Sequence, residues 1–192
     1  MAHEHRHTHR YLAMRELLHT LDGTLPGRLE ITREGIIHDV TAPNGPHELI
    51  VLRIRKRLEQ AMPNDLVAHT GVPDVENEPH QILRRRPDVI VIAEADMEGK
   101  AAFDPRTQLA AIEVVSHSNP DNDWVGKMRD YPLLGIPAYV IFDPRTGNGA
   151  VMTDIHPTPE GPRYATRKDF VYGEEVTIAD WTIPTDNLPH YA

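Results

Sequence analysis

The sequence contains no cysteine, which excludes disulfide bonds and metal sites built from thiolates and fits a cytoplasmic protein. It also lacks an apolar run long enough to span a bilayer, and its first residues lack the hydrophobic segment of a signal peptide. A basic surplus is missing as well, because the formal net charge is −9, whereas nucleic-acid-binding domains are usually basic. An acidic total still permits a local basic groove, and a bound divalent metal would offset part of the carboxylate charge.

The length of 192 residues suits a single domain with an adequate core. At the start of the chain, histidines alternate with other residues at His3, His5, His7 and His9. Such a tract can bind transition metals loosely, but a solvated terminal segment is the commoner case. We therefore expect a disordered histidine-rich tail over 1–10 and one folded domain over 11–192.

The apolar pattern alternates between helical and strand periods, with Gly and Pro at the breaks. It predicts a mixed α/β domain in which a central mixed β-sheet is flanked by helices and extended by a β-hairpin. We expect helices over 11–21, 47–62 and 121–134, the last kinked or ended by Pro132. We expect strands over 28–32, 36–40, 66–69, 88–93, 108–116 and 138–142, a hairpin of 150–155 with 163–167, and a final strand-like piece over 176–183.

One acidic residue interrupts the most apolar of these strands. Residues 109–115 are apolar at every position except Glu113, as expected of a strand buried on both faces of a sheet. A carboxylate inside such a strand is costly unless a partner or a cation compensates its charge. Glu113 therefore marks a candidate site.

A second acid and a lysine complete this candidate site. Asp88 opens the apolar run at 89–93, and Lys127 lies in the predicted helix that follows the strand of Glu113. Hydrolysis of a phosphodiester at neutral pH needs an activated water, and Mg²⁺ held by oxygen ligands can provide it. We predict that Asp88 and Glu113 are metal ligands and that the carbonyl group of Val114 is a third. Lys127 would orient the water and offset developing negative charge.

Structural roles for the same residues remain open alternatives. Glu113 could form an ion pair with Arg106 or Arg129, and Lys127 could pair with Asp123 on a helix surface. The Pro-Asp acid could cap a loop. The arginine and lysine cluster over 53–57 and the three arginines over 84–86 could contact phosphates or simply keep the surface soluble. His47, at the start of the second predicted helix, could reach the site or pack against neighbours.

At this point the residues resemble a known family, the Uma-type putative restriction endonuclease family, over about residues 25 to 180. The resemblance includes Glu30, Gly35 and His47 upstream. Its main motifs are Arg86-Pro87-Asp88-Val89, Ile112-Glu113-Val114-Val115-Ser116, Asp123, Lys127, Tyr131, Gly135-Ile136-Pro137-Ala138-Tyr139 and Phe142-Asp143-Pro144.

This resemblance implies a restriction endonuclease-like core of the PD-(D/E)xK superfamily and a metal-dependent endonuclease that hydrolyses DNA with Mg²⁺ or Mn²⁺. It implies Asp88 and Glu113 as ligands and Glu30 as an auxiliary acid. The usual pattern of this fold places lysine two residues after the glutamate, where this chain has Val115, so Lys127 would supply the charge from the following helix. Nucleases of this fold often act as dimers, and the resemblance therefore also implies a homodimer.

Two other functions compete with this prediction. The same scaffold could be a catalytically inactive nucleic-acid-binding or complex-forming module. A transition-metal protein could use the terminal histidines with His38, His69 and His80, but no two of these three share a helical spacing.

Overall fold

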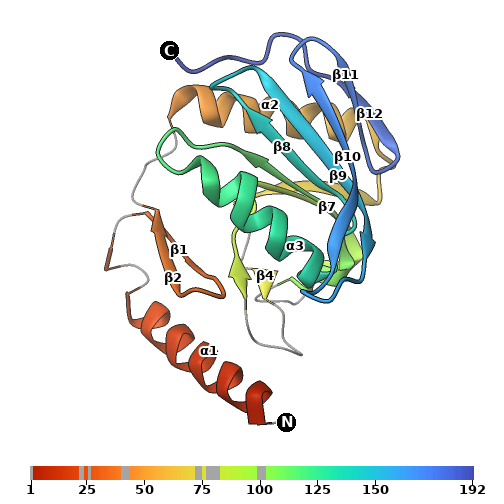
Figure 1. The fold of residues 1–192 in the computed structure, drawn as a ribbon. Helices are drawn as coiled ribbons and strands as arrows, with labels where there is room; N and C mark the ends of the chain where they lie inside the picture. Colours follow the sequence, from red (N-terminus) through yellow and green to blue (C-terminus); the bar gives the residue numbers. More distant parts are fainter. Residues whose placement is uncertain are drawn as a thin grey trace.

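A computed structural model of the chain describes residues 2–21, 24–25, 27–39, 44–71, 75–76, 83–98 and 103–192. Its centre is a six-stranded mixed sheet with the strand order β10-β9-β8-β7-β6-β3 (Figure 1). The strands are β3 (Leu66–Thr70), β6 (Val89–Ala93), β7 (Gln108–Val114), β8 (Tyr139–Asp143), β9 (Asn148–His156) and β10 (Arg163–Val171). The neighbours β7 and β8 pair in parallel, and the other neighbouring pairs are antiparallel. The predicted mixed α/β class with a central mixed sheet is therefore confirmed.

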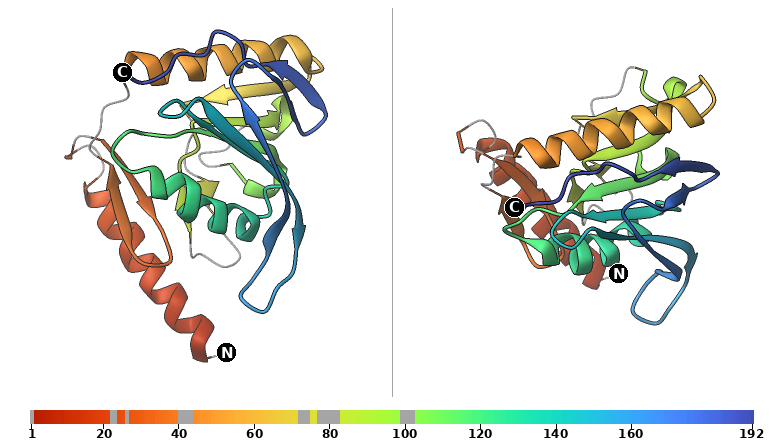
Figure 2. Two further views of the ribbon diagram at one scale, coloured as in Figure 1. Left: turned by 45° about the horizontal axis from the view of Figure 1, so that its top comes forward. Right: turned by 90° about the horizontal axis from the view of Figure 1, so that it is seen from above.

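Two layers of helix cover this sheet (Figure 2). Helix α2 (Gly45–Ala61) lies on one face together with the hairpin of β11 (Glu175–Ile178) and β12 (Trp181–Pro184). The opposite face is covered by the segment η3 (Asn122–Lys127) and helix α3 (Met128–Leu134). Because β6, β7 and β8 are buried between these layers, most of their side chains are apolar on both faces, which explains the apolar runs in the sequence that Glu113 interrupts.

Helix α2 confirms the helix predicted over 47–62, but it begins two residues earlier and ends one residue earlier. The side chain of Asn44 caps its first turn by accepting a hydrogen bond of 2.9 Å from the backbone N–H group of His47. The apolar stripe of the helix faces the sheet and is buried at Ile50, Ile54 and Leu58. The helix thereby fixes His47 at the end of the layer where the site lies.

The crossover between the parallel strands β7 and β8 contains the helix predicted over 121–134, but its first part, η3, is a π-helix. Helix α3 then includes Pro132 and continues to the predicted end at Leu134, so of the two expected effects of the proline, a kink or an end, the structure excludes the end. Pro132 is the fifth residue of α3, and its missing N–H group therefore costs this short helix only one internal hydrogen bond. The helix ends at Gly135, whose φ of 79° places it in the left-handed region.

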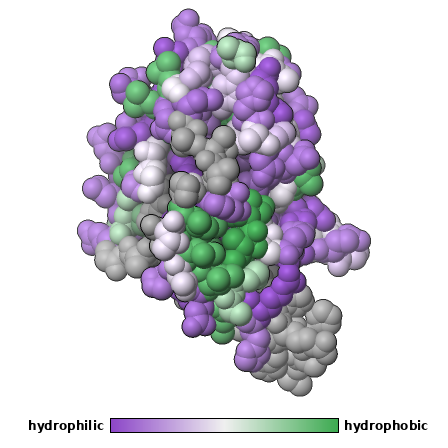
Figure 3. Space-filling model, turned by 90° about the vertical axis from the view of Figure 1, so that its left-hand side faces the viewer, coloured by the Kyte–Doolittle hydropathy of each residue, from purple (hydrophilic) through white to green (hydrophobic). Residues whose placement is uncertain are grey.

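A smaller sheet lies beside the central one, with the order β2-β1-β5-β4. Its strands are β1 (Arg28–Ile31), β2 (Ile36–Asp39), β4 (Val75–Glu76) and β5 (Arg84–Arg85). Helix α1 (Ala2–Leu21) packs against it through the buried side chains of Tyr11 and Leu18. The side of the molecule that carries α1 and the β1–β2 hairpin has one apolar patch in an otherwise largely hydrophilic surface (Figure 3).

Several segments differ from the sequence-based expectation. Residues 2–10, expected to be a disordered tail, continue helix α1, since neither Gly nor Pro interrupts this stretch. The final strand-like piece is a hairpin, because residues 179 and 180 form a turn between β11 and β12. The loop after β6 contains two short 3₁₀ helices, η1 (Glu94–Asp96) and η2 (Pro105–Thr107). In the described part of the chain, none of the helices is both long and apolar enough to cross a membrane.

Candidate active site

A cavity of about 80 Å³ opens where the small sheet meets the end of the β6–β7 pair. Strand β1, the start of α2, the residue before β6, the end of β7 and the segment η3 all contribute to its wall. The lining includes four acids, Glu30, Asp88, Glu113 and Asp123, and three basic residues, Arg28, Arg86 and Lys127. It also includes His47, Val114 and His117, and Tyr191 from the last residues of the chain. All four residues predicted to be catalytic therefore line one cavity.

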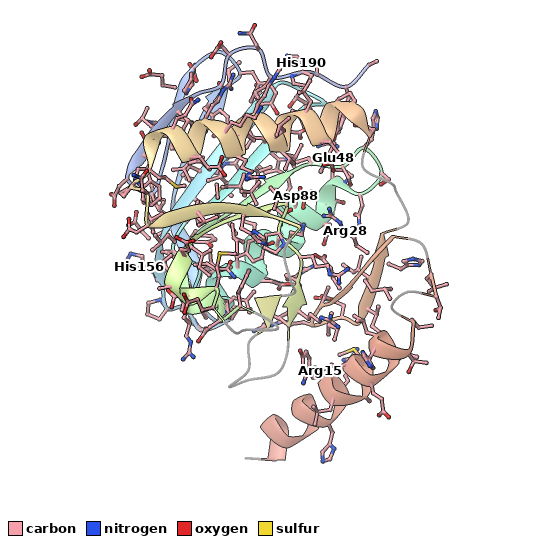
Figure 4. The ribbon with its side chains drawn as sticks, turned by 180° about the vertical axis from the view of Figure 1, so that it is seen from behind. Arg15, Arg28, Glu48, Asp88, His156 and His190 are labelled. Atoms are coloured by element: carbon pink, nitrogen blue, oxygen red, sulfur yellow. The ribbon has the colours of Figure 1, made fainter. Side chains whose placement is uncertain are left out.

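Asp88 directly precedes β6 and is buried. Its Oδ1 atom accepts a hydrogen bond of 2.9 Å from Nη1 of Arg28, and Figure 4 shows this arginine reaching from β1 toward the acid. Its Oδ2 atom accepts a hydrogen bond of 2.9 Å from the backbone N–H group of Val114. Burial alone would raise the pKa of Asp88, but its hydrogen bond and charge interaction with His47, followed by the charges of Lys127 and Arg28, hold the pKa well below its usual range.

Glu113 points from β7 toward the helical layer formed by η3 and α3. Nζ of Lys127 lies 2.8 Å from its Oε2 atom, and the hydroxyl group of Tyr131 donates a short hydrogen bond to its Oε1 atom. Lys127 also lies 2.9 Å from Oδ1 of Asp123, one turn earlier. The carboxylate in the apolar strand is thus compensated by an ammonium group, and the alternative ion pairs with Arg106 and Arg129 are not formed.

Lys127 carries one positive charge and contacts two acids, Glu113 and Asp123. Burial raises the pKa of Glu113 well above its usual value, and the negative charges of Asp88 and Asp123 raise it further. Burial likewise raises the pKa of Asp123 to about 6. Burial acts to lower the pKa of Lys127, but the charges of Asp123 and Glu113 outweigh this effect and raise it. The ammonium group of Lys127 therefore compensates the charges of several buried carboxylates, which repel one another.

Glu30, the predicted auxiliary acid, is held by a separate network. Its Oε2 atom lies 2.9 Å from Nη1 of Arg85, and its Oε1 atom accepts a hydrogen bond of 2.8 Å from the backbone N–H group of Arg86. The guanidinium group of Arg85 is fully buried and also binds Asp130 at 2.5 Å and Asn122 at 2.9 Å. This network joins the small sheet to the crossover helix that carries Lys127.

His47 reaches the site, which its sequence context left open. Its Nε2 atom lies 3.1 Å from the carbonyl oxygen of Val114 and 3.3 Å from Oδ2 of Asp88. The imidazole therefore contacts one predicted carboxylate ligand and the predicted carbonyl ligand together. Burial acts to lower the pKa of His47, but its hydrogen bond and charge interaction with Asp88 outweigh burial and raise the pKa.

The predicted ligands are oxygen atoms, which are the ligands that hard divalent cations such as Mg²⁺ prefer. Asp88, Glu113 and the Val114 carbonyl group supply oxygen ligands, and a carboxylate has about four lone-pair sites, so the hydrogen bonds present leave acceptor capacity on both acids. The excess of buried negative charge also favours a cation. Across the described part of the chain, however, no group of three or more His, Asp or Glu side chains is arranged to hold a metal ion. A cation would therefore require the present hydrogen bonds of Asp88 and Glu113 to adjust.

The basic clusters of the sequence have different roles. Arg53 and Arg57 of α2 donate to the backbone carbonyl groups of residues 184, 186 and 187, so these two arginines anchor the last segment of the chain. Of the three arginines over 84–86, Arg85 is buried and Arg86 lines the cavity.

The transition-metal alternative includes His69 and His80 among its ligands. His80 lies outside the described residues, and His69 packs edge-on against Phe103.

Sequence reasoning did not identify several residues of the site. Arg28, Asn122 and Tyr191 line the cavity, and Arg85 supports it, without any local pattern that would single them out. Tyr131 belongs to the family motif but had no assigned role. The separation of 60 residues between Arg28 and Asp88 shows why their contact was not visible in the sequence.

The fold and the cavity define a mixed α/β protein with buried acids and a lysine at one end of its sheet. Comparison with solved structures agrees: a protein from Anabaena variabilis, described as a putative nuclease belonging to DUF820, matches with a TM-score of 0.60 and 15% sequence identity. The match covers 80% of this chain and 84% of that chain, and it shows a shared fold. No curated protein matches the sequence.

The family model of Uma2, described as "Putative restriction endonuclease", matches residues 15–185. The chain belongs to this family. Membership confirms the resemblance found in the sequence and supports a nuclease-type function.

Proposed function

We propose that the protein is a metal-dependent endonuclease that hydrolyses phosphodiester bonds in DNA. The observation that carries the proposal is the juxtaposition of Glu113 and Lys127, 2.8 Å apart, in a cavity that Asp88 also lines. This is the set of groups that metal-assisted hydrolysis of a phosphodiester needs, and it occurs in a chain of the Uma2 family.

In this proposal Asp88, Glu113 and the carbonyl group of Val114 hold Mg²⁺ or Mn²⁺. The bound cation would supply positive charge for the phosphate oxygens and lower the pKa of a water molecule. Lys127 would orient that water and offset negative charge that develops on the phosphate, because its raised pKa keeps its ammonium group charged. Glu30 would act as an auxiliary acid in the cavity wall, where Arg85 and the backbone of Arg86 hold its carboxylate in place.

The surroundings of the cavity suit an anionic substrate. Arg28 and Arg86 line the cavity, so guanidinium groups lie beside its acids although the whole chain is acidic. Such side chains contact the phosphate backbone without selecting a sequence. A homodimer, which we expect from the family resemblance, would place two such sites on one duplex and allow both strands to be cut. We further propose that the enzyme acts in the cytoplasm, with which the lack of cysteine is compatible.

Nicking of a supercoiled plasmid tests this function. The wild-type protein should convert the plasmid in Mg²⁺ or Mn²⁺ and fail in EDTA, and Glu113→Ala should abolish the conversion. Glu59→Ala is a matched control, because Glu59 is an exposed acid on α2 that pairs with Arg55. Cleavage that persists in Glu113→Ala would contradict the proposed site.

One observation favours the second candidate, a catalytically inactive module on the same scaffold. Asp88 is already bound by Arg28 and by the backbone of Val114, so it can be explained as a structural residue that joins β1, β6 and β7. This alternative predicts no metal-dependent cleavage by the wild-type protein of any DNA tested, together with DNA binding that Glu113→Ala leaves unchanged.

A further inference from the structure

The last residues of the chain form an ordered strap beside the cavity. After β12, Thr185 and Leu188 are buried, and Arg57 of α2 donates hydrogen bonds of 2.9 Å and 2.7 Å to the carbonyl groups of Pro184 and Asp186. Residues 186–192 lie beyond the part of the chain that the family model matches. Buried side chains and hydrogen bonds to α2 thus hold this strap, residues 185–192, in place.

Tyr191 connects this strap to the site. Its backbone N–H group donates a hydrogen bond of 2.9 Å to the carbonyl oxygen of Pro144, and its hydroxyl group donates one of 2.9 Å to the carbonyl oxygen of Val115. Val115 follows directly after Glu113 and Val114, so the ring is tied to the strand that carries the proposed ligands. Tyr191 is itself part of the cavity wall.

The ring of Tyr191 is stacked on the imidazole of His117. The two ring centroids are 5.6 Å apart and their planes differ by 13°. His117 also lines the cavity, and its side chain is exposed to solvent. One of its ring faces is stacked on Tyr191, and because the residue is exposed, we infer that a second planar group can reach the other face.

The size of the cavity determines which part of a nucleotide meets this pair. A volume of about 80 Å³ is far below the several hundred cubic ångströms of pockets that enclose drug-sized ligands. The cavity can accept a phosphate group, whereas the attached nucleobase has to lie outside it, on the side where the lining is exposed to solvent. The exposed His117 and the half-buried Tyr191 belong to that part of the lining. Aromatic side chains bind unpaired bases by stacking, and they do so with little dependence on sequence.

We propose that the stacked pair His117–Tyr191 is a platform for an unpaired DNA base next to the scissile phosphate. The proposal rests on the proposed function and adds a substrate feature to it, because it requires a single-stranded or locally opened region at the site. The strap has the role of fixing Tyr191, and thereby the imidazole, in the stacking geometry.

Binding of a short fluorescein-labelled single-stranded oligonucleotide, followed by fluorescence anisotropy at fixed salt in Ca²⁺, tests the platform. A twin oligonucleotide with abasic positions lacks the bases but keeps the phosphates. His117→Ala should weaken binding of the base-containing strand by about 5- to 100-fold. It should leave binding of the abasic strand unchanged. Tyr191→Ala should behave like His117→Ala, whereas Tyr191→Phe should bind like the wild type because it retains the ring.

His156→Ala is the matched control, since this exposed histidine lies at the far end of β9, away from Arg28 and Asp88 (Figure 4). It should bind both strands like the wild type. Equal affinities of His117→Ala and His156→Ala would overturn the platform, as would equal losses for the two strands or a wild type that binds neither. The difference in affinity between the base-containing and the abasic strand does not depend on Glu113. Plasmid cleavage that persists in Glu113→Ala would refute the hydrolytic site while leaving the difference between the two strands in place.

Discussion

Replacement of Arg85 by methionine should destabilise the protein strongly, because this arginine is the centre of the buried network beside the site. Its side chain is 0% exposed and binds Glu30 at 2.9 Å, Asp130 at 2.5 Å and Asn122 at 2.9 Å. Methionine has a similar length but no charge, so Glu30 and Asp130 would remain buried without their cation. Removal of one partner of a buried ion pair costs about 3–5 kcal/mol.

Thermal and urea unfolding followed by circular dichroism measure this loss. For a chain of this length, about 1 kcal/mol corresponds to a shift in Tm of about 2–4 °C, so the expected decrease is about 6–20 °C. The control is Arg106→Met, because Arg106 is 66% exposed and pairs with Asp104 at the surface. An exposed pair of this kind is worth about 1 kcal/mol or less.

A second substitution identifies the cause of the loss. If the uncompensated acids are responsible, Glu30→Gln added to Arg85→Met should restore part of the stability, although Glu30→Gln alone should be destabilising. An Arg85→Met protein that unfolds within about 1 kcal/mol of the wild type would refute the role assigned to this network. Additive losses of stability for Arg85→Met and Glu30→Gln in the double variant would also refute that role.

Two further predictions concern other parts of the fold. Burial acts to raise the pKa of Asp143, but hydrogen bonds from Arg145 and Trp124 outweigh it and lower the pKa below 3.8. The contribution of Asp143 to stability is therefore present above its unfolded-state pKa and is lost as the pH falls through the lowered folded-state pKa. Asp143→Asn should be less stable than the wild type at neutral pH and should lose less stability on acidification. Urea unfolding between about pH 6 and about pH 2 measures this difference, and a pH dependence equal to that of the wild type would contradict the prediction. Gly149→Ala should destabilise by about 1–3 kcal/mol, because an added Cβ atom would lie 2.4 Å from the carbonyl oxygen of Ile141 and 2.1 Å from the ring of Phe170. Gly45→Ala in the first turn of α2, where nothing lies within 4 Å, should not lower the Tm, and equal effects of the two substitutions would refute the packing argument.

The sequence predicted the central part of the fold because the strongest local signals coincide with buried elements. The runs at 89–93, 109–115 and 138–142 are apolar because both faces of β6, β7 and β8 are covered. Helix α2 was predictable from its apolar stripe. The expected disorder of residues 1–10 and the expectation that Pro132 would kink or end its helix followed average tendencies of such segments, whereas the structure has a helix over 2–10 and continues one past Pro132.

The candidate site was only partly predictable. Glu113 could be found because an acid in an apolar strand needs a compensating charge, and Lys127 because it lies in the next helix. Arg28 and Tyr191 come from β1 and from the last residues of the chain, and no short-range pattern connects them with Asp88 or Glu113. Long-range contacts of this kind depend on how the small sheet and the strap pack against the central sheet.

Binding of Mn²⁺ to the metal-free protein, measured by electron paramagnetic resonance and calorimetry, tests directly whether Asp88 and Glu113 hold a divalent cation. We expect saturable binding of Mn²⁺ by the wild type and by Glu59→Ala, and loss of this binding in both Asp88→Asn and Glu113→Gln. Equal Mn²⁺ binding by all four proteins, or none by the folded wild type, would contradict the claim that these buried carboxylates hold a divalent cation.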